Sequence, residues 1–246
     1  MNTCKKCNFE FKSNYCPNCG HPQKLERINR RYILSEIAGV LNFQKGILYT
    51  MKELLIRPGH SIRVFISEDR NRMVKPIVFI LITSLIYTII VRIFHFEDGI
   101  IDGAREALYN TDLATLAILK WVQENYGYAN IIMALFIGLW VKLFFRKHSF
   151  NFYEILVLLC FVMGIGMLIY SVFDIIRGLT HTNLMLIQVL VGFIYTTYAI
   201  GQFFDKRKIA NYVKALISYL SGMITFFFVA MGIGILIDLI RYNIKT

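Results

Sequence analysis

The chain is poor in charge, in acidic residues and in proline. Of its 246 residues 17% are charged, 16 are Asp or Glu, and 4 are Pro. A soluble domain usually has about 25% charged residues, so this composition argues against an ordinary soluble protein. The sequence also lacks a Ser-His-Asp, Cys-His, metalloprotease or phosphate-binding motif. These absences favour a protein that is not an enzyme.

Long apolar runs are abundant. Five runs approach or exceed the roughly 20 residues that a helix needs to cross the hydrocarbon layer. They are continuous rather than alternating, which favours helices over the strands of a membrane barrel. The sequence therefore predicts an all-α integral membrane protein with a transmembrane domain at 74–246. The predicted spans are Val74–Phe94, Ala129–Phe145, Tyr153–Phe173, Leu184–Phe204 and Val213–Ile240.

Charge is distributed unevenly between the connections. Most of the 27 Lys and Arg residues lie before the first run, between the second and third, or between the fourth and fifth. The connection after the first run is acidic. The positive-inside rule then predicts a plasma (inner) membrane protein with a cytosolic N-terminus and an outer C-terminus. Basic residues beside spans suit the lipid bilayer as a partner, whereas nucleic acid is not expected, because no concentrated basic face carries stacking aromatics.

Four of the five cysteines lie within the first 19 residues, as Cys4-x2-Cys7 and Cys16-x2-Cys19. Four thiolates complete the tetrahedral coordination of a structural Zn2+ ion and leave no open position. We therefore predict a zinc ribbon at 1–24 with these four ligands and Zn2+ as its cofactor. A segment this short cannot bury a core of its own, so the metal would supply the folding energy. Two redox-active pairs are the alternative, but no thioredoxin-like pattern surrounds them.

Residues 25–73 are basic and amphipathic. Helices are predicted at Tyr32–Leu41 and Gln44–Ile56, and a third, short one follows Pro58. In the second helix an apolar face is expected to contain Ile47, Leu48, Met51, Leu54 and Leu55, with Lys45, Lys52 and Glu53 elsewhere. Two arrangements are open: the helices lie in the head-group plane, or they pack on the spans as a collar. Candidate head-group contacts are Arg57, Arg63, Arg70 and Arg72.

Ionisable residues inside membrane spans are candidates for function. Here they cluster at span ends, where anchoring and local ion pairing, such as Arg92 or Arg177 with Asp174 or Asp238, explain them. The alternative is a shallow outer polar pocket or a proton relay. The candidates for an intramembrane polar site are Arg92, Glu154, Asp174 and Asp238. An aromatic belt at the outer interface is expected from Tyr126, Tyr128, Tyr170 and Tyr242.

Several stretches resemble a known group of proteins. These are the CPNCG knuckle, LYTMKELLIRPGHSIRVFISEDRNRMVKP at 48–76, FNFYEILVL at 150–158 and YTTYAIGQFF at 195–204. Together they resemble a bacterial membrane family classed as a domain of unknown function. The resemblance implies an N-terminal zinc ribbon joined to a multi-span helical domain. One departure is Ile155, which stands where the family has a histidine after the glutamate.

Two functions are consistent with these patterns. The first is a non-enzymatic scaffold or sensor whose cytosolic zinc ribbon recognises a cytosolic protein partner. The second is a transporter of a small solute or ion, with the ribbon as a regulatory module. The oligomeric state is open in both.

Overall fold

A computed structural model describes residues 2–3, 7, 9–12, 14, 16–19, 46–94 and 113–245 of the chain. Contacts divide the chain into two units, Met1–Asn42 and Phe43–Thr246. The helix predicted at Tyr32–Leu41 lies outside the described residues.

The first unit contains a short antiparallel hairpin. Strand β1 (Asn2–Thr3) pairs with strand β2 (Glu10–Phe11), with Asn2 opposite Phe11 and Thr3 opposite Glu10. Two residues per strand cannot bury an apolar core, because a hairpin of two strands is marginal even at greater length. The hairpin therefore needs a source of stability besides the backbone hydrogen bonds between its strands.

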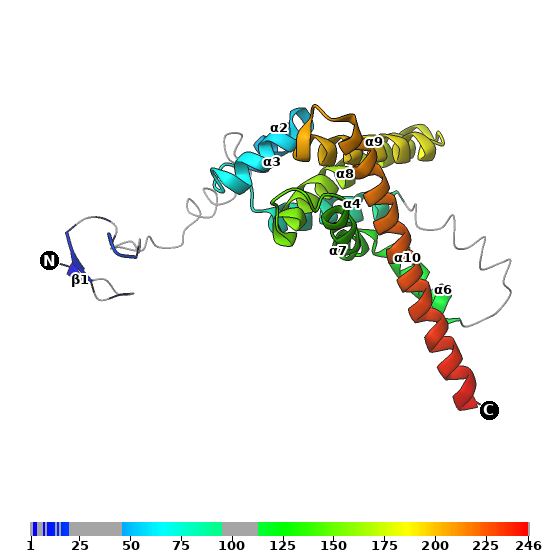
Figure 1. The fold of residues 1–246 in the computed structure, drawn as a ribbon. Coiled ribbons are helices and arrows are strands. Elements are labelled where there is room, and N and C mark those ends of the chain that lie inside the picture. The colour runs from blue at the N-terminus through cyan, green and yellow to red at the C-terminus, as the bar shows by residue number, and fades with distance from the viewer. Residues whose placement is uncertain are drawn as a thin grey trace. The chain divides into compact units, whose positions relative to one another are not determined.

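Helices make up the second unit. Two short ones, α2 (Ile47–Ile56) and α3 (Pro58–Ser67), precede the first long one, α4 (Pro76–Ile93). In the described part after residue 112 come α6 (Ala114–Glu124), α7 (Tyr126–Phe144), α8 (Phe152–Thr180), α9 (Met185–Asp205) and α10 (Ile209–Lys245). Figure 1 shows α8 between α4, α7 and α9, and α10 crossing α7 and α9.

Five helices, α4, α7, α8, α9 and α10, are long and apolar enough to cross a membrane. They coincide with the five predicted runs, so the prediction of membrane-spanning helices is confirmed in length and composition. Two helices extend well beyond their runs. Helix α8 begins one residue earlier and reaches Thr180, and α10 starts at Ile209 and reaches Lys245.

The interior of the bundle is apolar near α8. Phe161 packs its ring against Phe65 of α3 and Phe79 of α4, with ring centroids 5.2 and 5.7 Å apart. Leu158 and Leu159 are completely buried. The outward faces also carry large apolar side chains, such as Leu186, which is 79% exposed, and Phe228, which is 70% exposed. Such surfaces are stable in lipid, which is as apolar as they are.

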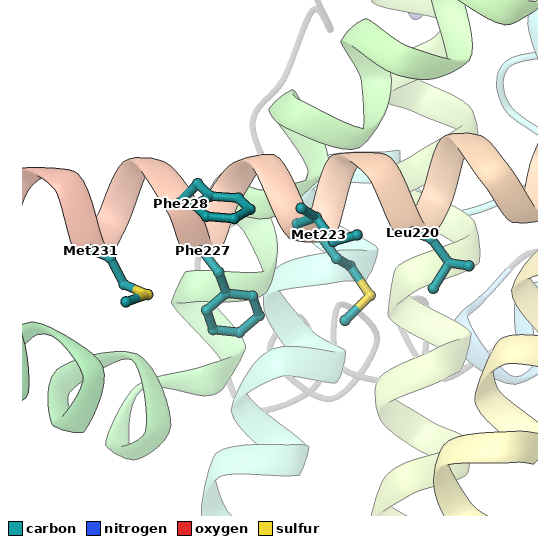
Figure 2. A pocket seen from close by; sticks show the side chains of 6 residues that line it. Leu220, Met223, Phe227, Phe228 and Met231 are labelled. Atoms are coloured by element: carbon teal, nitrogen blue, oxygen red, sulfur yellow. The ribbon is translucent and has the colours of Figure 1, made fainter.

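Helix α10 is the longest helix and continues beside α6, as Figure 1 shows. Asp238 of α10 accepts hydrogen bonds from the backbone N–H groups of Ala114 and Thr115 at 2.6 and 3.2 Å. It thereby satisfies donors at the start of α6. Further back along α10 lies an apolar hollow of about 260 Å³ (Figure 2). It is lined by Leu220, Met223, Ile224, Phe227, Phe228 and Met231.

Candidate functional site

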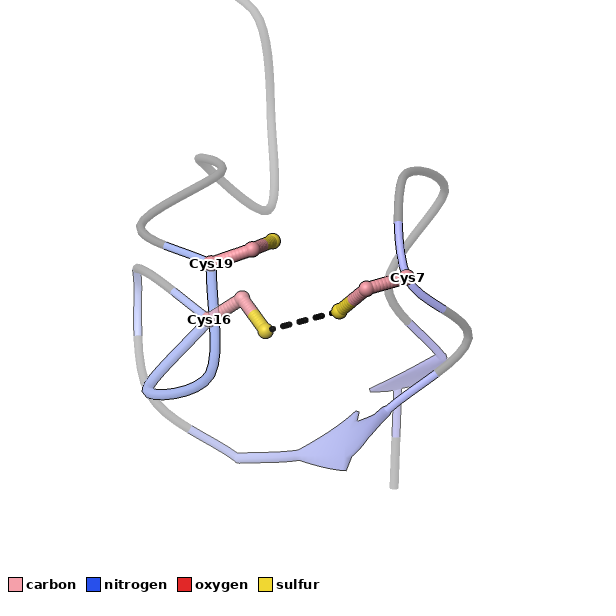
Figure 3. A group of neighbouring side chains, drawn as sticks. All are labelled: Cys7, Cys16 and Cys19. Carbon is pink, nitrogen blue, oxygen red and sulfur yellow. Dashed lines mark hydrogen bonds between the residues drawn. The ribbon is translucent and has the colours of Figure 1, made fainter.

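Three of the four predicted zinc ligands lie together in the first unit. The Sγ atoms of Cys7, Cys16 and Cys19 all lie within 4.8 Å of one another, and those of Cys7 and Cys16 are 3.5 Å apart. In Figure 3, Cys7 comes from the segment between the strands, while Cys16 and Cys19 come from the turn after β2. Cys16 is 2% exposed. Cys4 lies outside the described residues.

The spacing of these sulfur atoms suits a shared metal ion. Two thiolates on one tetrahedral Zn2+ ion, each about 2.3 Å from it, lie about 3.8 Å apart. The 3.5 Å between Cys7 and Cys16 is close to that value and far longer than a disulfide bond of about 2.05 Å. Three converging thiols are thus a donor set that fits Zn2+, with room in its coordination for a fourth ligand.

In the second unit, α2 buries a different face from the predicted one. Ile47 and Leu54 are buried as expected, but Leu48 and Leu55 are 37% and 51% exposed. Glu53, predicted to lie outside the apolar face, is only 7% exposed. The reason is tertiary: the carboxylate has partners on α3 and on the turn that follows it, so the helix is rotated to point Glu53 inward.

Glu53 is the centre of a polar network that joins three segments. Its Oε1 accepts a hydrogen bond from Arg57 Nη2 at 3.1 Å, and its Oε2 accepts one from Ser61 Oγ at 2.8 Å. Arg72 Nη2 lies 3.7 Å from Oε2, and Arg72 Nε donates to the Tyr49 hydroxyl at 2.7 Å. One carboxylate therefore connects α2, α3 and the turn leading to α4.

Burial by itself would raise the pKa of Glu53. The hydrogen bonds from Arg57 and Ser61 and the charges of Arg57 and Arg72 outweigh that effect, and the pKa lies below its ordinary value. The same network raises the pKa of Arg72, chiefly through its hydrogen bond with Tyr49. At neutral pH the Glu53 carboxylate is therefore ionised and keeps its hydrogen bonds.

Helix α3 docks on the C-terminal end of α9. Arg63 donates through Nε and Nη2 to the backbone carbonyls of Phe203 and Phe204, and its guanidinium lies 5.8 Å from the Phe203 ring centroid. These carbonyls belong to the last turn of α9, where a helix lacks intrahelical donors. Arg63 supplies those donors and places positive charge at the negative end of the helix dipole.

Gly59 allows this docking. Its N–H donates to Gln202 Oε1 at 2.7 Å. A Cβ built at this position would lie 2.4 Å from the backbone C of Gln202 and the backbone N of Phe203, so no other residue fits. Together, Gly59 and Arg63 attach α3 to α9. Of the two arrangements left open for this region, α2 and α3 therefore adopt the collar, packed on the spans.

Three of the four arginines expected at lipid head groups thus have protein partners. Arg57 and Arg72 pair with Glu53, and Arg63 caps α9. The side chain of Arg57 is 53% exposed and that of Arg72 is 37% exposed. Arg70 is exposed in the turn before α4. Contact of these side chains with head groups stays a prediction.

Among the residues predicted for an intramembrane polar site, Glu154, Asp174 and Asp238 have separate hydrogen-bond partners. Glu154 forms a capping box with Asn151 at the start of α8, and Asp238 caps α6 from α10. Asp174 lies near the other end of α8 from Glu154 and is 3% exposed. Its carboxylate accepts a hydrogen bond from Gln188 Nε2 at 3.2 Å. Arg177 Nη2 lies 3.9 Å from it, which is one of the ion pairs expected. Arg92 lies in the last turn of α4.

Sequence reasoning missed Glu53, Gly59 and Gln202. Glu53 looked like a solvent-facing charge between apolar residues. One available signal was the spacing of Tyr49, Glu53 and Arg57, which recur every four residues and so share a helix side. Gln202 carried no signal, because its partner is far away in the sequence.

Comparison with known proteins concerns this same region. Residues 44–88 match the family model described as "Protein of unknown function (DUF3667)". The chain resembles that family over α2, α3 and most of α4. No curated protein and no solved structure matches the chain. The Glu53 network and the two residues that attach α3 to α9, Gly59 and Arg63, all belong to the matched stretch.

Proposed function

We propose that this protein is a non-enzymatic scaffold or sensor of the plasma (inner) membrane, whose N-terminal zinc ribbon recognises a cytosolic protein partner. The observation that carries this proposal is the convergence of Cys7, Cys16 and Cys19 in a chain with five helices suited to membrane spanning. A site closed by four thiolates, with Cys4 as the fourth, has no open position for a substrate. It therefore serves structure and recognition rather than catalysis.

The charge pattern supports the orientation. The C-terminal end of α9, which binds Arg63 of α3, is followed by the basic stretch Lys206–Lys208, which separates α9 from α10. The positive-inside rule assigns this end of the bundle to the cytosol, and with it the collar and the ribbon. The collar then attaches the cytosolic region to the span bundle by polar contacts and a bundle-facing apolar side. Anionic lipid head groups are the partners proposed for its exposed arginines.

The metal proposal is tested first, on the purified full-length chain. Elemental analysis should find about one zinc per protein, and the double variant Cys16→Ser/Cys19→Ser should lose it. Cys160→Ser, which changes the thiol in α8, is the matched control and should retain the metal. Purified wild-type protein without zinc would overturn the proposal.

The recognition proposal is tested in cells. Wild-type protein and the two variants are brought to equal membrane abundance, crosslinked and isolated, and their crosslinked partners are identified by mass spectrometry. Partners crosslinked to residues 1–24 should disappear in the double variant and persist with Cys160→Ser. An identical set of crosslinks in all three proteins would refute partner recognition by the ribbon.

Transport of a small solute or ion is a second candidate. The observation that favours it is Asp174, an acidic residue buried inside the bundle together with Gln188.

A further inference from the structure

Five hydroxyl groups gather inside the bundle, one from each candidate span. The ring of Tyr126 packs against those of Tyr87 and Tyr170, with centroids 5.4 and 6.5 Å apart. The side chain of Tyr219 lies near those of Tyr126 and Thr196. The members of this hydroxyl cluster are Tyr87 of α4, Tyr126 of α7, Tyr170 of α8, Thr196 of α9 and Tyr219 of α10. Two of these tyrosines, Tyr126 and Tyr170, are also among those expected in an outer aromatic belt.

A carboxylate lies beside the hydroxyl cluster. Asp174 follows Tyr170 by four residues, so both lie on one side of α8, and Asp174 interacts electrostatically with the Tyr87 hydroxyl. Arg177 Nη2 lies 3.9 Å from its Oδ1, longer than the roughly 2.8 Å of a tight charged hydrogen bond. Among the described residues, this is a loose ion pair.

An unpartnered acceptor lies one turn along α7 from Tyr126. Asn130 is 5% exposed, and its Oδ1 has no hydrogen-bond partner among the residues that the structure describes. Around the axis of α7, Asn130 lies between Tyr126 and Gly127. Tyr126 contacts Tyr170 of α8, and Gly127 lies against Ser84 of α4, so both residues face the inside of the bundle. A buried carbonyl oxygen without a donor destabilises the fold, and a ligand with N–H groups would remove that cost.

Space exists on the same side of α8. Gly166 precedes Tyr170 by four residues and is buried, yet a Cβ built on it meets no atom of the described residues within 4 Å. Most buried glycines in this bundle have neighbours far closer, such as Gly164, whose Cβ would lie 2.7 Å from the Phe79 ring. The void at Gly166 thus lies on the side of α8 that carries Tyr170 and Asp174.

We infer that the hydroxyl cluster, Asn130 and Asp174 form a binding site inside the bundle for a small cation of the ammonium class. Such a cation donates hydrogen bonds to hydroxyl and amide oxygens, is attracted by aromatic ring faces and balances a carboxylate. This inference goes beyond the scaffold or sensor function and does not depend on the zinc ribbon.

The test uses the full-length protein in lipid nanodiscs and measures the melting temperature with ammonium, methylammonium or choline chloride at equal ionic strength. Ammonium and methylammonium should raise it, by roughly 5 °C once the cation exceeds its Kd about 100-fold. Choline is too bulky for the space that one glycine leaves open and should give no rise. Equal curves for all three salts would show an effect of ionic strength only and would overturn the inference.

Two glycine variants separate binding from folding. Gly166→Ala places a methyl group in the void and should fold at least as well as wild type, because alanine favours a helix over glycine, but it should lose the ammonium-dependent rise. Gly232→Ala is the matched control, since in the described part of the chain its Cβ also meets nothing within 4 Å, but it lies on the exposed side of α10. It should keep the full rise.

Asn130→Leu is an independent variant of similar volume. It removes the unpartnered oxygen and should leave the salt-free melting temperature equal or higher while abolishing the rise with ammonium. A rise that persists in both Gly166→Ala and Asn130→Leu would overturn the site. These outcomes are independent of the zinc and crosslinking measurements, so either proposal can fail alone.

Discussion

Replacing Arg63 by alanine tests whether the collar is held on the bundle by the end of α9. The variant removes two hydrogen bonds to Phe203 and Phe204 carbonyls and the contact with the Phe203 ring. It also leaves two carbonyls of the last helical turn without these donors. We expect α3 to open from α9 more often, while the span bundle stays intact.

The size of the effect follows from these contacts. A hydrogen bond from a charged group contributes about 1.5–3 kcal/mol, and the lower value applies because Arg63 is only partly buried. The cation–π contact adds about 0.5 kcal/mol at such a site. The two hydrogen bonds and the ring contact together then account for about 3.5 kcal/mol, which corresponds to roughly a 300-fold increase in the population of the opened collar.

Hydrogen exchange measured by mass spectrometry reads this population directly. In the Arg63→Ala variant, peptides covering 58–67 should exchange roughly 300-fold faster than in wild type, while peptides from α8 should keep their rates. Arg63→Lys keeps the charge without the planar pair of donors, so its exchange rates should lie between those of wild type and Arg63→Ala. Arg70→Ala, an exposed arginine in the neighbouring turn, is the matched control and should leave the rates unchanged.

One result would refute the reasoning. If the amides of α3 exchange equally fast in wild type and Arg63→Ala, the bonds to α9 do not hold the collar. The apolar contacts of Ile62 and Phe65 alone would then do so, since both side chains are buried.

Three further predictions concern the same end of the bundle. Gly59→Ala should separate α3 from α9 by about 1 Å and cost about 1–3 kcal/mol, measured as a lower melting temperature in nanodiscs, whereas Gly232→Ala should not. Because the pKa of Glu53 is lowered, its stabilisation is present above about pH 4.3 and is lost as the pH falls through the folded pKa. Glu53→Gln should therefore lower the melting temperature by a few degrees at pH 7 and converge with wild type near pH 3. Burial, and then Arg63, Lys208 and Lys214, lower the pKa of His148. Its protonation therefore destabilises the fold as the pH falls below about 6.5, and His148→Gln should flatten the melting temperature between pH 6.5 and 5.

The ends of the helices were only partly predictable. The start of α8 was placed within one residue, and its cause is local, because Asn151 and Glu154 cap each other across one turn. The end of α10 was not predicted as closely. The sequence from Ile233 to Ile240 continues the apolar run, whereas the charge of Asp238 indicated that the span ends there. Asp238 instead caps α6, through a contact with a residue more than 120 positions away in the sequence.

The network in the collar shows the same division. The break between α2 and α3 was predicted from Pro58, whose ring restricts the residue before it. The buried side of α2 was predicted wrongly at Glu53, because hydrophobicity alone assigns a carboxylate to water. Arg57, Ser61 and Arg72 reverse that preference by supplying its hydrogen bonds and its countercharge.

Sequence by itself determined the approximate limits of the five described helices that are long and apolar enough to cross a membrane. The reason is that the thickness of the hydrocarbon layer fixes how long an apolar run must be. Each pair of cysteines is likewise a local feature of the sequence, because the two residues between the thiols form a turn. Only the tertiary structure decided that α2 and α3 pack on the spans and that hydroxyls from five helices meet inside the bundle. Those features depend on helix rotation, and in a uniformly apolar helix the sequence does not specify which side faces its neighbours.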